Sequence, residues 1–228
     1  MMATGGRKTN WFAIWVSVAV VVVLVVVGIL VAALNNQATA PGPTPEGASI
    51  DSSTGAISVG EGPDVLATYV DFICPACGQF EQSYGPTIQG LVDDGSITLD
   101  IHPIAILDSQ SQGTRYSSRA ASAMYCVAVA DPEASLPFLT AMYENQPPEA
   151  TSGLTDEEIV TIAESVGVTD ASDCITEGRY MDYVTRMTPE TPVKEGAGGI
   201  STPTVVLNDE ILTLTGDPQA DILDRLQG

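Results

Sequence analysis

Two cysteines separated by two residues, Cys74 and Cys77, are the residues of this sequence best suited to chemistry. They follow an apolar run, Val65–Ile73, that is typical of a buried strand, and the residues after them favour a helix. A cysteine at the start of a helix meets the positive end of the helix dipole, which favours thiolate over thiol. Since thiolate is the form that attacks disulfides, the pattern predicts a reducible disulfide that exchanges with other thiols.

Half of a zinc site and a structural disulfide are two other uses of such a pair. Zinc would need two further ligands, and the remaining candidates, Cys126, Cys174 and His102, are not paired at ligand spacing. The strand–CxxC–helix context favours redox chemistry over zinc binding. We therefore expect a site that needs no metal and no organic cofactor.

An uncharged apolar run from Trp11 to Leu34 predicts one membrane-spanning helix. A helix of this length reaches about 36 Å, enough for a hydrocarbon core of roughly 30 Å. The apolar part of a cleaved signal peptide is usually shorter, so a retained anchor is favoured over a signal peptide. Arg7 and Lys8 precede the run, which places residues 1–10 in the cytoplasm and the rest of the chain outside.

All 29 acidic residues lie beyond the apolar run, together with only six of the eight Lys and Arg residues. Such an acidic domain is unsuited to nucleic acid, whose phosphates attract positive charge. A solvated, soluble surface explains the acidity without any specific ligand. We expect a single-pass protein of the cell membrane whose main domain is extracytoplasmic and binds no nucleic acid.

Four cysteines on the oxidising side of a membrane suggest disulfides and allow three pairings. If Cys74 pairs with Cys77, Cys126 and Cys174 remain for a second disulfide. These two lack CxxC spacing, so a structural role is favoured. Closing a long loop in this way typically contributes about 2–4 kcal/mol of stability.

Residues 35–56 are rich in Pro, Gly, Ser and Thr and are predicted to be a flexible linker, followed by one domain at 57–228. The domain pattern is strand–helix–strand, then a helical block at about 108–198, then a hairpin and a last helix. We expect Gly85-Pro86 to kink or break the first helix, which spans Pro75–Leu91. The predicted elements are, in order, Val65–Ile73, Pro75–Leu91, Ile97–Ile101, the helical block, Thr204–Leu207, Ile211–Leu214 and Asp217–Leu226.

Two stretches in this order resemble the DsbA-like branch of the thioredoxin superfamily. They are Tyr69–Cys77, which carries the CxxC pair, and Gly199–Asn208, which carries Ser201-Thr202-Pro203-Thr204 before a late strand. The resemblance implies an α/β thioredoxin fold with an inserted all-helical domain, preceded here by one transmembrane helix. It also implies a secreted or membrane-tethered thiol–disulfide oxidoreductase, and the anchor and second cysteine pair are similar to actinobacterial members.

The resemblance implies a role for each residue of the two motifs. Cys74 would be the exposed nucleophile that forms the mixed disulfide, and Cys77 would be the buried resolving thiol. Pro203 matches a proline that is cis in the family. It would turn the backbone of Thr202 towards Cys74, where it can hydrogen-bond an extended substrate.

Two departures from the family pattern concern the acidity of the nucleophile and the path of its protons. The dipeptide between the cysteines is Pro75-Ala76, whereas strongly oxidising members carry Pro-His, so Cys74 should be less acidic here. Many relatives bury an acidic residue six positions before the first cysteine, and that position is Thr68. Asp71 is nearer and either faces Cys77 or lies on the surface, while the lone His102 is expected to be structural.

The expected function is therefore to introduce disulfides into reduced or unfolded exported proteins. The family resemblance suggests that a membrane reoxidase, DsbB-like or VKOR-like, restores the Cys74–Cys77 disulfide after each turnover. A reductase or isomerase of exported thiols, for instance in cytochrome maturation, is an alternative with the same chemistry. A non-catalytic module that binds metal through the two thiols is an alternative of a different class.

Overall fold

The computed structural model describes residues 11–38 and 42–227, which belong to two separate compact units. The first unit contains helix α1 (Trp11–Ala38), within which Ile14–Val31 is long and apolar enough to cross a membrane. An anchor and a signal sequence both fit this description. The predicted cytoplasmic segment, residues 1–10, lies outside the described residues.

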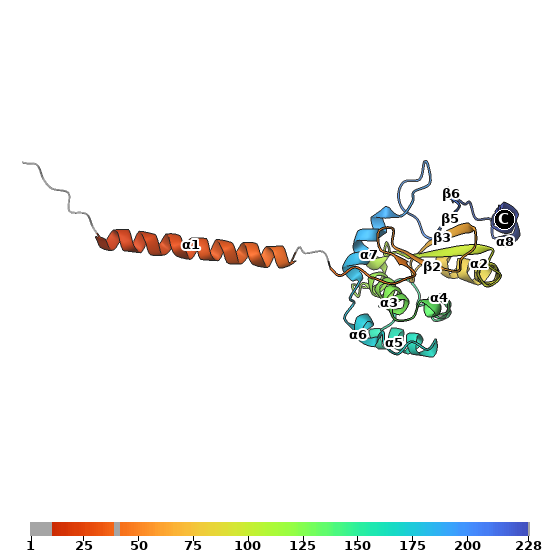
Figure 1. Cartoon of the computed structure of the whole chain (residues 1–228), viewed down its shortest axis with the longest axis horizontal. Helices are drawn as coiled ribbons and strands as arrows, with labels where there is room; N and C mark the ends of the chain where they lie inside the picture. Colours follow the sequence, from red (N-terminus) through yellow and green to blue (C-terminus); the bar gives the residue numbers. More distant parts are fainter. Residues whose placement is uncertain (1–10, 39–41, 228) are drawn as a thin grey trace, which may run out of the picture. The chain divides into compact units, whose positions relative to one another are not determined.

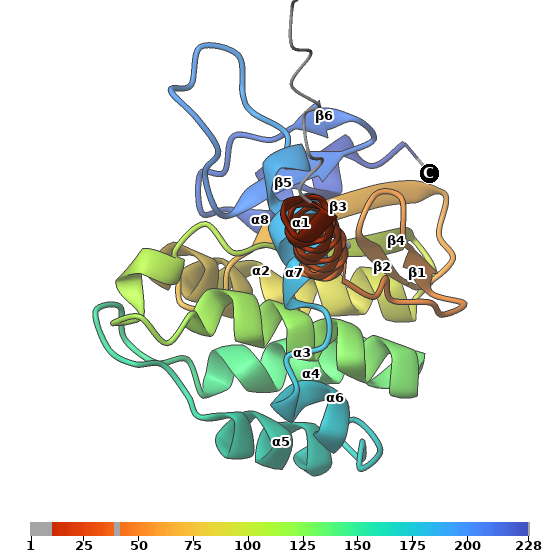
Figure 2. The same cartoon turned by 90° about the vertical axis from the view of Figure 1, so that its left-hand side faces the viewer.

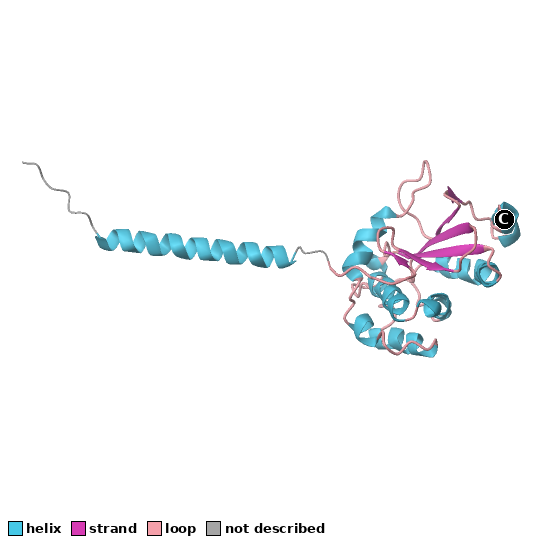
Figure 3. Ribbon diagram, viewed as in Figure 1, coloured by secondary structure: helices cyan, strands magenta, loops and turns pink. Residues whose placement is uncertain are grey.

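A six-stranded mixed sheet forms the centre of the second unit, with strand order β1-β2-β4-β3-β5-β6 (Figures 1 and 3). Neighbouring strands β3 and β4 are parallel and joined by helix α2, while the other neighbours are antiparallel. This confirms the predicted thioredoxin-like strand–helix–strand unit. The strands are β1 (Ile50–Asp51), β2 (Ala56–Val59), β3 (Asp64–Val70), β4 (Ile97–Pro103), β5 (Thr204–Leu207) and β6 (Glu210–Ile211).

Helix α2 (Pro75–Asp93) runs without a break through Gly85-Pro86, so the predicted break is wrong. The proline removes one backbone N–H, whose partner would be the carbonyl of the exposed Gln82, where water can replace the lost bond. The opposite side of the helix is held by burial against the sheet. Its buried residues recur at helical spacing: Cys77, Phe80, Tyr84, Ile88 and Leu91.

The inserted domain is helical, as predicted, and Figure 2 shows α3, α4 and α5 stacked below α2 and the sheet. Helix α3 is its centre, and small Ala and Ser residues let neighbouring helices approach it closely, since nearly all its side chains are buried. The helices are α3 (Tyr116–Ala130), α4 (Ser135–Glu144), α5 (Asp156–Ser165), α6 (Ser172–Thr176) and α7 (Met181–Met187). Short 3₁₀ turns flank them at Asp108–Gln110, Pro132–Ala134 and Thr188–Glu190.

The linker predicted at 35–56 is wrong for residues 42–56, which are an ordered part of the domain. Pro45 is buried, and the Ser58 N–H donates to the Ser49 carbonyl at 2.7 Å. Strands β1 and β2 add an edge to the sheet, with β2 paired to β4. Composition did not predict these strands because the surrounding segment is polar and the strand residues that anchor it to the core, Ala56 and Ile57, are only two.

The C-terminal hairpin agrees with the prediction in place but not in length. Asn208 and Asp209 form its turn with φ values of 47° and 68°, a left-handed conformation that Asn and Asp tolerate. Strand β6 contains only Glu210–Ile211, and the last helix is divided into α8 (Pro218–Asp221) and a 3₁₀ turn at Leu223–Arg225.

A disulfide joins Cys126 of α3 to Cys174 of α6, with a Cα–Cα distance of 5.8 Å. Both residues are buried, so the bond lies inside the helical insertion and apart from the Cys74–Cys77 pair. It connects two elements that are 48 residues apart in the chain.

Replacing both Cys126 and Cys174 with Ala should lower the free energy of unfolding by about 2–4 kcal/mol, because the unfolded chain gains the freedom of the opened loop. Chemical denaturation of the oxidised protein and the double variant measures this difference. Cys74→Ser is the matched control and should change stability little. Equal midpoints and slopes for the native protein and the double variant would contradict a stabilising bond.

Candidate functional site

The CxxC pair lies where strand β3 passes into helix α2. Cys74 is the N-cap residue, with extended backbone (φ −72°, ψ 117°), and Pro75 follows in the first turn, where its missing N–H costs nothing. The Cys74 N–H donates to the Asp71 carbonyl at 3.0 Å, and the Cys77 N–H donates to the Cys74 carbonyl at 3.1 Å. This turn places Cys74 at the positive end of a 19-residue helix.

Thr202, far away in the sequence, lies against both sulfurs. The Cys74 thiol points to the Thr202 carbonyl oxygen at 3.5 Å, and Cys77 Sγ lies 3.0 Å from the Thr202 hydroxyl oxygen. The Thr202–Pro203 peptide bond is cis, as the family resemblance implied. Strand β5, which begins at Thr204 and pairs with Tyr69 of β3, holds this loop beside the cysteines.

The hydroxyl of Thr202 lies between the Tyr69 carbonyl and the Cys77 sulfur. Its oxygen is 3.2 Å from the Tyr69 carbonyl oxygen and 3.0 Å from Cys77 Sγ. When its hydrogen is donated to Tyr69, the hydroxyl accepts from the Cys77 thiol. When the one hydrogen of that thiol is donated to Cys74, the hydroxyl can donate to Cys77 instead.

The pKa values of the two thiols are shifted in opposite directions. A hydrogen bond from the Cys77 thiol, helped by the Cys77 and Ala76 backbone N–H groups, lowers the pKa of Cys74 to about 7. Burial raises the pKa of Cys77 well above its ordinary value. The arrangement combines a stabilised thiolate with a protonated neighbour, which is what thiol–disulfide exchange requires.

Cys74 is less exposed than the family resemblance implied, since only 6% of its surface is accessible. The Thr202 carbonyl covers its sulfur, and Gln146 covers its backbone carbonyl. Pro75 and Ala76 beside it are exposed. This dipeptide is therefore the solvent-accessible part of the CxxC turn.

Asp71 has a fully buried carboxylate, so the surface position that the sequence left open is excluded. Its oxygens accept from the Ile73 N–H (3.1 Å), the Leu107 N–H (3.0 Å) and the Ser117 hydroxyl (2.7 Å). Desolvation raises the pKa of Asp71 to about 6 despite these three donors. Thr68 stands six positions before the first cysteine, where many relatives bury an acidic residue. It is buried, and its hydroxyl has no hydrogen-bond partner among the described residues.

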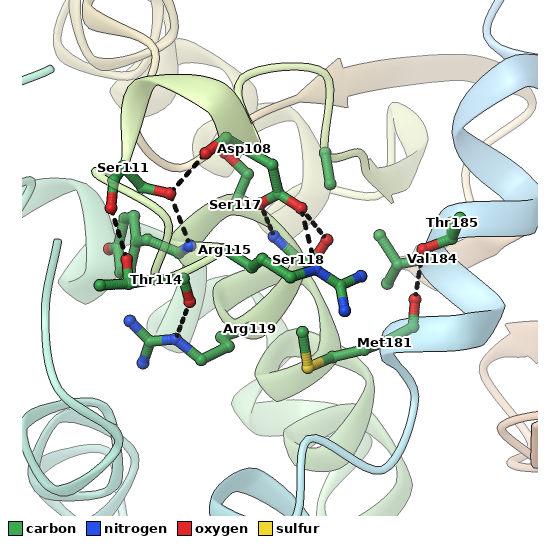
Figure 4. Close-up of polar contacts among 12 residues, drawn as sticks. Asp108, Ser111, Thr114, Arg115, Ser117, Ser118, Arg119, Met181, Val184 and Thr185 are labelled. Atoms are coloured by element: carbon green, nitrogen blue, oxygen red, sulfur yellow. Dashed lines mark hydrogen bonds and ion pairs between the residues drawn. The ribbon is translucent and has the colours of Figure 1, made fainter. Parts of the chain in front are cut away.

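A polar network holds the loop that presents Ser117 to Asp71 (Figure 4). The Asp108 carboxylate accepts from the Ser118 N–H at 2.9 Å and from its hydroxyl at 2.5 Å. Ser111 donates to the Asp108 carbonyl and accepts from the Tyr116 N–H at 3.1 Å. The start of α3 is thereby fixed against the active-site turn.

Gln146, which follows α4, is a site residue that the sequence did not reveal. Its amide nitrogen donates to the Phe72 carbonyl at 3.1 Å and to the Cys74 carbonyl at 2.8 Å. A side chain at Gly78 would collide with the Gln146 Oε1 atom, so glycine leaves room for this contact. That glycine, directly after the CxxC motif, was the one available signal that another residue approaches there.

His102 has a structural environment, as expected. It is buried, stacks on the Tyr69 ring at 4.1 Å between centroids, and desolvation lowers its pKa to about 4. It is therefore neutral at ordinary pH. Among the described residues, no group of three or more His, Cys, Asp and Glu side chains is arranged to hold a metal ion.

The comparisons with known proteins agree with this site and fold. The family model described as thioredoxin matches residues 54–224. The chain therefore belongs to the thioredoxin family, in its branch of DsbA-like thiol–disulfide oxidoreductases. This confirms the resemblance and the fold class inferred from the sequence.

Two solved structures from Mycobacterium tuberculosis are similar to this chain. The reduced form of the disulfide bond oxidoreductase DsbG is 34% identical, with a TM-score of 0.65 over 72% of this chain and 83% of that one. Reduced DsbA is 35% identical, with a TM-score of 0.65 over 73% of this chain and 88% of that one.

The serine/threonine-protein kinase PknE of Mycobacterium tuberculosis is also similar, with 36% identity over 149 residues, which is 61% of this chain. The match covers 26% of the kinase, so the chain spans about a quarter of the length of the curated relatives it matches. The name of that relative describes the whole kinase rather than the shared segment.

Asp71 should give the unfolding free energy a distinct pH dependence. Its folded pKa of about 6 exceeds the ordinary 3.8, so the folded protein binds a proton that the unfolded chain releases between these values. This contribution is full below about pH 4 and is lost as the pH rises through about 6, a change of about 1–3 kcal/mol.

Asp71→Asn removes the titrating group, so urea denaturation of both proteins between about pH 4 and 7 isolates its effect. The unfolding free energy of the native protein minus that of the variant should decline as the pH rises. A difference that stays constant over this range would contradict a raised pKa for Asp71.

Proposed function

We propose that the protein donates disulfides to reduced or unfolded exported proteins through the Cys74–Cys77 pair. The observation that supports this is the opposite protonation of the two thiols, with the pKa of Cys74 lowered and that of Cys77 raised. A stabilised thiolate favours the reduced form, so the disulfide form tends to accept electrons from substrate thiols.

The proposed reaction begins with the Cys74–Cys77 disulfide. A substrate thiolate attacks Cys74 Sγ, the bond between the two enzyme sulfurs breaks, and Cys77 takes up a proton. A second substrate thiolate then attacks the substrate sulfur of the mixed disulfide and releases Cys74 as a thiolate. The substrate loses two electrons and gains a disulfide, and the enzyme becomes the dithiol.

Thr202 is proposed to position the substrate during this exchange. Its carbonyl lies beside Cys74 Sγ, at the end of the loop that leads into β5. An extended substrate segment can accept or donate backbone hydrogen bonds there, as in the addition of a strand. The Cys74 thiol no longer occupies the carbonyl once it has become a thiolate or a disulfide.

Reduction or isomerisation of exported thiols is a second candidate, and one observation favours it. The pKa of Cys74, about 7, is close to the roughly 7 of thioredoxin and well above the roughly 3.5 of strongly oxidising DsbA. The dipeptide Pro75-Ala76 lacks the histidine that would stabilise the thiolate further.

We also propose that α1 anchors the protein in the cell membrane with residues 1–10 in the cytoplasm and the domain from Gly42 outside. The apolar span Ile14–Val31 and the preceding Arg7 and Lys8 support this orientation. A membrane reoxidase of the DsbB-like or VKOR-like type would then accept electrons from the dithiol. Protease added to intact cells should remove the domain if this orientation is right.

Oxidation of a reduced, unfolded cysteine-containing protein tests the proposed activity. The oxidised protein should form disulfides in it, and Cys74→Ser should abolish the reaction. Cys77→Ser, mixed in its reduced form with a disulfide-bonded protein, should accumulate a mixed disulfide: the Cys74 thiolate attacks one substrate sulfur, the other substrate sulfur leaves as a thiol, and no neighbouring thiol then releases Cys74. Full activity of Cys74→Ser would reject the assignment, and faster reshuffling of scrambled disulfides than net oxidation would favour the isomerase.

A further inference from the structure

A groove of about 640 Å³ lies beside the dithiol, between helices α2 and α4. The two helices contact each other, and Figure 1 shows α4 below α2. Apolar, amide and carboxylate side chains line the groove, chiefly Pro75, Glu81, Gln82, Tyr143, Glu144 and Gln146.

The groove lies beside the residue that carries the reactive sulfur. Pro75, at one end of the groove, directly follows Cys74, and Gln146 in its wall donates to the Cys74 carbonyl at 2.8 Å. Gly78 adds no side chain between them. A polypeptide joined to Cys74 through a disulfide can therefore extend into the groove, which lies on the side of the helical insertion.

Two carboxylates in the groove have no partner of opposite charge among the described residues. No Lys or Arg lines the groove, and among residues 42–227 the ion pairs are made by Arg115, Arg119, Arg179 and Arg225 with acids other than Glu81 and Glu144. Glu81 is half-buried, and desolvation raises its pKa to about 7. A cation bound beside it would offset this desolvation.

The remaining polar wall of the groove is neutral. Gln79, Gln82 and Gln89 extend along α2 at the groove. Each amide offers both a donor and an acceptor, so it can pair with the peptide groups of an extended chain whatever its sequence. Pro75, Pro86 and Tyr143 supply apolar surface between them.

We infer that this groove binds the segment of the reduced substrate polypeptide next to its reacting cysteine and favours segments with Lys or Arg. The amides provide contacts that are independent of sequence, and Glu81 and Glu144 provide the charge preference. The inference rests on the proposed function, because it assigns the groove to the substrate that forms a mixed disulfide with Cys74.

The test uses the full chain in neutral detergent and three synthetic dithiol peptides that differ only in two residues flanking one cysteine, Lys, Ala or Glu. The second-order rate constant for oxidation of each peptide by the protein is divided by the rate constant of the same peptide with a small neutral disulfide. This ratio corrects for differences in the acidity of the peptide thiols. The Lys peptide should react roughly threefold or more faster than the Glu peptide, as expected for two partly exposed ion pairs.

The double variant Glu81→Gln, Glu144→Gln should bring the ratio of the rate constants for the Lys peptide and the Glu peptide close to one. Asp93→Asn with Asp94→Asn is the matched control, since it removes the same charge from the far end of α2, about 27 Å from Cys74, and should leave the ratio unchanged. A ratio near one in the native protein, or equal loss in both pairs of variants, would overturn the inference.

Equilibrium binding of the same peptides with serine in place of cysteine separates the two proposals. If no peptide is oxidised, the proposed function fails, and binding of the Lys peptide that depends on Glu81 and Glu144 still supports the groove. If all peptides are oxidised alike and bind alike, the groove assignment fails while the proposed function stands.

Discussion

The contact of Thr202 with both sulfurs is the interaction on which the site depends. Its hydroxyl lies 3.2 Å from the Tyr69 carbonyl and 3.0 Å from Cys77 Sγ, and burial keeps Cys77 protonated. When Cys74 is a thiolate, Cys77 donates its one hydrogen to it, and the Thr202 hydroxyl can donate to Cys77 in turn. Antiparallel pairing of β5 with β3 maintains this contact, so the sheet order that brings residue 202 to residue 74 is a condition of the chemistry.

The helical insertion supports the same turn from the opposite side. Ser117 of α3 and the Leu107 N–H hold the Asp71 carboxylate, and Gln146 after α4 holds the carbonyl of Cys74. Neither α3 nor α4 supplies an active-site sulfur, yet contacts from α3 and from the residue after α4 restrain the backbone that carries Cys74. The insertion therefore serves as a wall of the active site as well as a cover for the sheet, and its groove beside α2 extends the site towards the substrate.

Local patterns predicted much of this arrangement, and contacts between distant residues account for the rest. The CxxC pair after a strand, and Thr202-Pro203 before one, could be recognised because short segments carry them. Gln146 could not, since its contact with Cys74 spans 72 residues and no local pattern marks it. The low exposure of Cys74 and the strands at 50–59 also follow from tertiary contacts rather than from composition.

The reduction potential of the Cys74–Cys77 pair, measured by equilibration with glutathione, tests the central claim most directly. Disulfide donation requires a potential above the roughly −270 mV of thioredoxin, towards the roughly −120 mV of DsbA, although the pKa of Cys74 alone is close to that of thioredoxin. Cys74 and Cys77 should then oxidise other proteins. A potential at or below that of thioredoxin would contradict disulfide donation and assign the site to reduction.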